Sequence, residues 1–152
     1  KRGEQINLLY SNEKFSVPPN LYIIGMMNTA DRSLALLDYA LRRRFSFFEV
    51  QPAFQNETFK SYVNELNNPD AFNRVVDEIK SLNHQIVEEL GTGFQIGHSY
   101  FVGDAYKVDT VNRIEEVIEY EIIPQLFEYW FDDEQKANNW AERLRGCCDG
   151  EK

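Results

Sequence analysis

Four polar side chains that suit chemistry on a phosphate lie within residues 28–44. Asn28 and Asp31 follow shortly after an apolar run, and Arg43 and Arg44 close the segment. An amide can accept from and donate to a water or a phosphate oxygen, and a guanidinium can stabilise charge that develops on a transferred phosphoryl group. The spacing therefore predicts a site for phosphoryl transfer. The alternative for Asn28 and Asp31 is a local turn, in which the side chain bonds to nearby backbone.

The elements predicted to position these side chains are strands of a parallel sheet. Residues 21–24 and 45–50 are short apolar runs, the first of which follows a turn signal, and such runs predict strands that are buried on both faces. Ligands bind beyond the carboxyl ends of such strands, where Asn28 lies. Between the two runs we expect Asp38 to cap a short helix at residues 39–44.

The segment MMNTADRSLALLDYALRRRF, residues 26–45, closely resembles the sensor-1 and arginine-finger segment of AAA+ proteins of the McrB type. Those proteins are the GTP-driven motor subunits of modification-dependent restriction systems. A weaker resemblance continues through GFQIGHSYF, residues 93–101. It implies an α/β fragment, the distal strands of a P-loop AAA+ core, followed by a mostly α-helical lid subdomain.

The resemblance also implies roles for single residues. Asn28 would act at the γ-phosphate, and Asp31 would help to hold Asn28, the attacking water or a neighbouring subunit. Arg43 matches the arginine finger, with Arg44 as a second candidate. His98 lies where AAA+ lids often supply a second sensor, usually an arginine. It could contact nucleotide from the lid, but a packed structural histidine is the reading we favour.

The nucleotide implied by the resemblance is GTP, or ATP, with Mg²⁺, held mainly by residues upstream of this chain. The implied partners are further copies in a ring, a McrC-like nuclease subunit, and DNA bound through a separate domain absent here. The chain has no G-x-x-x-x-G-K-[ST] loop and no apolar strand that ends in paired acids. We therefore expect the chain alone not to hydrolyse nucleotide. Its two histidines lie far apart without a cysteine partner, so we predict no metal site.

Charge divides the chain near residue 52. The net charge is −9, which argues against a general nucleic-acid-binding surface. Residues 1–48 carry seven Lys/Arg against four Asp/Glu, whereas residues 49–152 carry nine against twenty-one. We place a subdomain boundary there, with the core part at residues 1–52 and the lid at residues 53–152.

No apolar run is long enough to cross a bilayer, so no membrane partner is predicted. Cys147 and Cys148 are adjacent and offer no disulfide framework, which is typical of a protein of the reducing cytoplasm.

Apolar spacing also predicts the remaining elements. Residues 6–10 and 15–17 are expected to form a hairpin. Residues 94–102 are expected to be a strand or an extended loop, and Asp70 is expected to cap the second and longest helix. Helices are predicted at residues 56–66, 70–90, 110–120, 124–131 and 134–146.

Two other functions compete with a GTP-driven restriction motor. One is an ATP-driven remodelling protein of another AAA+ branch. The other is a non-catalytic interaction module that retains the AAA+ lid. An intact phosphate loop upstream would exclude the interaction module.

Overall fold

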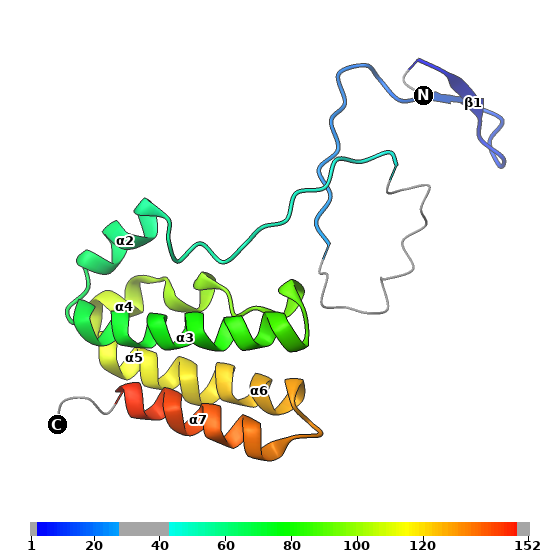
Figure 1. The fold of residues 1–152 in the computed structure, drawn as a ribbon. Helices are drawn as coiled ribbons and strands as arrows, with labels where there is room; N and C mark the ends of the chain where they lie inside the picture. The colour runs from blue at the N-terminus through cyan, green and yellow to red at the C-terminus, as the bar shows by residue number, and fades with distance from the viewer. Residues whose placement is uncertain (1–2, 28–42, 149–152) are drawn as a thin grey trace.

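The computed structural model describes residues 3–27 and 43–148. Asn28, Asp31 and Asp38 lie outside the described residues, as does most of the helix predicted at residues 39–44. The described chain comprises a small β-hairpin, irregular segments and a helical part that contains all the helices drawn in Figure 1. The predicted fold class, an α/β fragment followed by a mostly α-helical lid subdomain, is confirmed in that a small two-stranded sheet precedes a mostly helical part.

The hairpin is the only sheet in the described residues. Strand β1 (Gln5–Asn7) pairs antiparallel with β2 (Lys14–Ser16), with Ile6 opposite Phe15. Both strands are exposed, and the hairpin lies apart from the helical part (Figure 1). The predicted hairpin is therefore confirmed, with a shorter first strand than expected and with both strands starting one residue earlier.

The strands predicted at residues 21–24 and 45–50 are wrong for this structure. Neither segment has regular secondary structure, and their apolar side chains are exposed, with Ile24 at 93% and Phe48 at 90%. A strand needs neighbours for its backbone N–H and C=O groups. Within the described residues β1 and β2 pair only with each other, so these runs have no strand to join.

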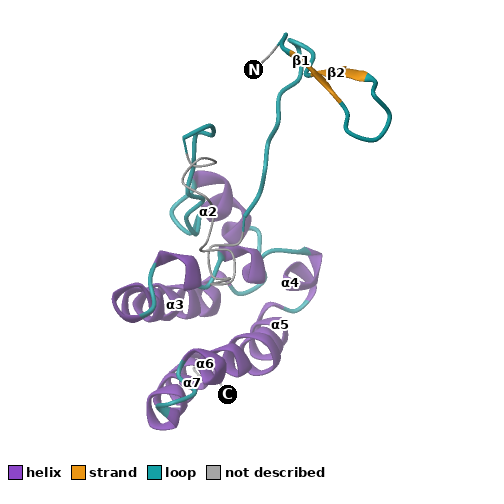
Figure 2. Ribbon diagram, turned by 90° about the vertical axis from the view of Figure 1, so that its right-hand side faces the viewer, coloured by secondary structure: helices purple, strands orange, loops and turns teal. Residues whose placement is uncertain are grey.

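The helical part is built around α3 (Pro69–Glu89), which packs against α2 (Glu57–Asn64), α5 (Thr110–Val117) and α7 (Glu134–Cys148). Figures 1 and 2 show these helices gathered into one bundle. The other elements are short: the 3₁₀ turns η2 (Thr92–Phe94) and η3 (His98–Phe101), the helices α4 (Asp104–Val108) and α6 (Ile123–Tyr129), and the π-helical turn η4 (Ile118–Ile122).

The N-cap of helix α3 lies two residues earlier than expected. The Asn68 side chain accepts a hydrogen bond from the backbone N–H of Ala71, and Pro69 occupies the first turn, where its missing N–H costs nothing. The prediction that Asp70 caps this helix is therefore wrong. Asp70 lies in the first turn, where its negative charge interacts favourably with the helix dipole.

Helix α3 presents one apolar face to the core, as its spacing predicts. Phe72, Ile79, Leu82 and Ile86 are fully buried on that face. Because a buried aliphatic side chain contributes about 1.5–3 kcal/mol to stability, this face holds the bundle together. Opposing side chains from α5, η4, α6 and α7 complete the core, namely Ile114, Val117, Ile118, Ile122, Leu126, Ala137, Trp140, Ala141 and Leu144.

Residues 94–102 are not a strand. The segment folds into the turns η2 and η3, joined by an irregular stretch around Ile96, which is fully buried. The extended-loop alternative is closer to what is observed. Helix α4 was not predicted, because five residues are too few to show a helical period.

No helix within the described ranges is both long and apolar enough to span a membrane. In the same ranges, no cluster of three or more His, Cys, Asp or Glu side chains is placed to hold a metal ion.

Candidate functional site

The loop of residues 91–103 carries His98 and is held against the bundle by a buried asparagine. Asn83, on the apolar face of α3, donates from Nδ2 to the carbonyl of Ile96 (2.9 Å). Its Oδ1 accepts from the backbone N–H of the same residue (2.6 Å). Both polar groups of Ile96 are thereby satisfied inside the core, so one side chain replaces a strand partner.

His98 lies where the chain enters the helical part. Its Nδ1 accepts a hydrogen bond from the backbone N–H of Ala53 (3.1 Å). The imidazole also meets the rings of Phe54 and Phe59 edge-on, with centroids 6.3 Å and 6.1 Å away. The favoured interpretation of His98 as a packed histidine therefore fits this geometry. Since Nδ1 accepts, the proton of the neutral ring is on Nε2.

Two tyrosine hydroxyls bond to backbone carbonyls of the same loop. Tyr106 donates to the carbonyl of Tyr100 (2.6 Å), and Tyr129 donates to the carbonyl of Phe94 (2.8 Å). Burial raises the pKa of Tyr106 and of Tyr129 above the usual value for tyrosine. Both hydroxyls therefore keep their protons and remain donors to the loop.

Arg43 and Arg44 lie in an exposed turn. Within the described part of the chain, no hydrogen bond or ion pair joins either guanidinium to another residue. Their placement leaves both side chains accessible to a ligand or to another subunit.

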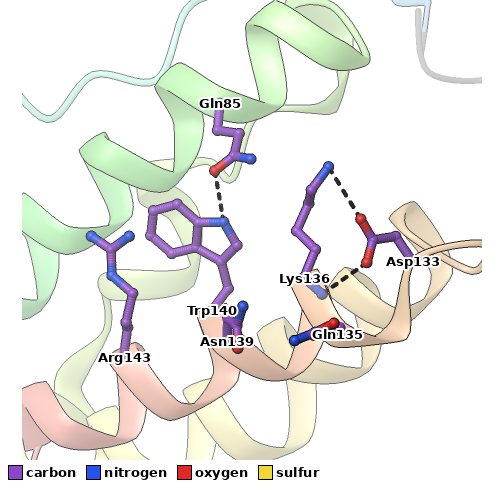
Figure 3. Close-up of a pocket in the computed structure, with 7 residues that line it drawn as sticks. All are labelled: Gln85, Asp133, Gln135, Lys136, Asn139, Trp140 and Arg143. Atoms are coloured by element: carbon purple, nitrogen blue, oxygen red, sulfur yellow. Dashed lines mark hydrogen bonds and ion pairs between the residues drawn. The ribbon is translucent and has the colours of Figure 1, made fainter.

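A polar pocket of about 370 Å³ lies between α3 and α7 (Figure 3), and Arg43, Arg44 and His98 are not among the residues that line it. The ring of Trp140 forms one wall, and its Nε1 donates to Oε1 of Gln85 (2.9 Å). The guanidinium of Arg143 stacks 3.9 Å from the centre of that ring. The lining residues are Gln85, Asp133, Gln135, Lys136, Asn139, Trp140 and Arg143.

Lys136 and Asp133, two charged residues at the rim of this pocket, pair with each other, whereas Arg143 pairs with Glu78 of α3 (2.6 Å). Lys136 contacts Glu89 (3.0 Å) and Asp133 (3.6 Å), and Trp130 donates to Glu89 (2.7 Å). Hydrogen bonds from Gln85, and then from Lys136 and Trp130, lower the pKa of Glu89. We interpret these contacts as a polar staple that joins α3 to the end of α6 and the start of α7.

Asn83 was missed in the sequence although a signal was available. It lies four residues after Ile79 and three before Ile86, on the apolar face of α3. A polar side chain at such a position must find partners when the face is buried. What the sequence did not show is which partner it takes.

We expect Asn83→Leu to destabilise the chain by about 3 kcal/mol, because it leaves the N–H and C=O of Ile96 unpaired in the core. Urea unfolding of the two proteins measures the difference. Asn73→Leu, an exposed asparagine on the same helix, is the matched control and should change stability by under about 0.5 kcal/mol. An Asn83→Leu protein as stable as this control would contradict the structural role.

Two comparisons relate the chain to known proteins. Residues 74–138 match the family described as McrB, alpha-helical lid domain. The chain is 44% identical, over 96% of its length, to the Type IV methyl-directed restriction enzyme EcoKMcrB subunit of Escherichia coli (strain K12). The matched part is 34% of that protein, so the chain spans about a third of its relative's length.

Proposed function

Because this chain is of the McrB type and carries that family's α-helical lid, we propose that it is the sensor and lid segment of a GTP-hydrolysing AAA+ motor for methyl-directed DNA restriction. The observation that carries this proposal is the 44% identity over 96% of the chain. This similarity also covers residues that precede the match to the lid family, which begins at residue 74.

Two parts of the chain, which meet at residue 52, have different proposed roles. Residues 1–52 belong to the α/β core, where Asn28 orients the attacking water and Asp31 supports it. Arg43, with Arg44 beside it, acts on the nucleotide of a neighbouring subunit. Residues 53–152 are the lid, and the Nε2–H of His98 is its candidate donor to the nucleotide. The Ala53 hydrogen bond to His98 supports a boundary at this point.

Magnesium is assigned to residues outside this chain. The described residues offer no acidic cluster that suits Mg²⁺, so we assign no ligand to the ion here. The contribution of this chain to the reaction is instead positional and electrostatic: an amide that orients water and a guanidinium that stabilises charge.

The proposed partners follow from the proposed chemistry. An arginine finger that serves another subunit requires a further copy of the protein beside it, and we propose a ring of such copies. The exposed turn at Arg43 and Arg44 is compatible with that contact. A McrC-like nuclease subunit would cut the DNA, and a separate domain would bind it.

The test uses the longer protein that contains this chain, together with its nuclease subunit. We expect GTP turnover well above ATP turnover, and cleavage of DNA carrying methylcytosine but not of the unmethylated duplex. Turnover of ATP alone, with no cleavage, would instead favour a remodelling protein of another AAA+ branch. Lack of any turnover, with an absent phosphate loop, would favour an interaction module.

We expect the 152-residue chain alone to bind nucleotide weakly or not at all and to show no turnover. The phosphate loop supplies most of the grip on the phosphates, and this chain has none. Calorimetry with GTP, ATP and slowly hydrolysed analogues, with and without Mg²⁺, measures this. Micromolar affinity that depends on Mg²⁺ would show that the nucleotide site lies within residues 1–152.

A further inference from the structure

His98 joins two segments that are 45 residues apart in the chain. On one side is the entry segment, which we define as residues 52–55. On the other is the loop that Asn83 and two tyrosine hydroxyls hold to the bundle. Within the described residues, the bond from the Ala53 N–H to Nδ1 of His98 is the hydrogen bond that links this loop to the entry segment.

Phe54 strengthens the same junction. Its side chain is 5% exposed and packs against His98 and two phenylalanine rings. The ring centroids of Phe59 and Phe101 lie 5.5 Å and 6.1 Å from that of Phe54. The entry segment is therefore docked on the helical part from Ala53 onward. Immediately before it, Val50 and Gln51 are exposed, and no hydrogen bond or ring contact ties them to another described residue.

We propose that His98 is a positioning residue that locks the entry segment to the lid, so that the lid moves as one body from Ala53 and bends against the core at residues 51–52. This inference rests on the proposed function, because it concerns motion between an AAA+ core and its lid. Pro52 fixes its own φ, so the bend uses the ψ of Pro52 and the backbone dihedral angles of Gln51. A displacement of the His98 ring would then also displace the entry segment, to which it is hydrogen-bonded at Ala53.

The two ring nitrogens allow this role to be separated from nucleotide contact. An asparagine places its amide atoms as far from the backbone as Nδ1, whereas a glutamine reaches one bond further, as Nε2 does. His98→Asn therefore keeps an acceptor for Ala53 and loses the Nε2 donor. His98→Gln does the reverse, and His98→Leu loses both groups while it remains apolar.

Hydrogen–deuterium exchange at the Ala53 amide of the nucleotide-free longer protein tests the lock. Losing one hydrogen bond should speed exchange about tenfold. We expect this acceleration in His98→Leu and His98→Gln, and exchange close to wild type in His98→Asn. His84→Leu, at an exposed histidine of α3, is the matched control and should leave Ala53 unchanged. Slow exchange of the Ile79 and Leu82 amides in every variant confirms that the lid is folded.

The proposal is overturned if His98→Leu and His98→Gln protect Ala53 as well as wild type does, or if His98→Asn loses protection as they do. Nucleotide affinity and turnover of the same variants bear on a different point. A variant that keeps Ala53 protected but loses turnover would show that the Nε2 donor of His98 acts on the nucleotide, as the proposed function states. It would not count against the lock. Lack of turnover in the wild-type protein would contradict the proposed function. The exchange measurement would still decide whether His98 holds the entry segment.

Discussion

Arg43→Ala should lower nucleotide hydrolysis by the longer protein about 10³–10⁵-fold, the range typical of a missing arginine finger. A guanidinium is planar and always charged, so it suits charge that spreads over a transferring phosphoryl group. The variant should still bind nucleotide, because its own phosphate loop is unchanged. Steady-state turnover together with nucleotide affinity measures both parts of this expectation.

Matched variants identify which arginine acts. Arg74→Ala changes an exposed arginine of α3 and should leave turnover near wild type. Arg44→Ala should cost less than Arg43→Ala, and the opposite order would move the finger to Arg44. Arg43→Lys should restore little, because an ammonium lacks the planar fork.

Mixing experiments test whether Arg43 serves a neighbouring subunit. A variant with a disabled phosphate loop is inactive but carries an intact Arg43. In mixed rings with Arg43→Ala, that arginine can act on the intact site of the other subunit, so part of the activity should return. If mixed rings form and activity stays flat, Arg43 acts within its own subunit or only holds the ring together.

Asn28→Ala should lower kcat by about 10²–10³, the usual cost of removing one preorganised polar group from a reacting centre. KM should change little, because an amide that orients water contributes mainly in the transition state. Steady-state kinetics over a range of GTP concentrations separates the two constants.

The control for Asn28 is Asn73→Ala, which makes the same change at an exposed position of α3. A turn residue would behave differently from a catalytic one. If Asn28→Ala lowers stability while turnover per folded molecule stays normal, then Asn28 only shapes the turn after residues 21–24.

The sequence by itself determined the family resemblance and the local elements. Helix α3 was predictable because its apolar residues repeat at helical spacing over 21 residues, which places these residues on one face of the helix. The hairpin was predictable because two short apolar runs flank a polar turn. The residue types at Asn28 and Arg43 indicated phosphoryl transfer without any knowledge of their surroundings.

Tertiary structure decided the features that depend on residues distant in the chain. The spacing of α3 marked Asn83 as facing the core, but its pairing with Ile96 depends on how the loop returns to the helix. The pairing of His98 with Ala53, 45 residues away, likewise has no local pattern. The runs at residues 21–24 and 45–50 have strand-like composition and no strand pairing, because a strand is completed by neighbours and not by its own residues. Local periodicity thus specifies which elements can form, whereas contacts across the chain decide which of them form and where each polar group finds its partner.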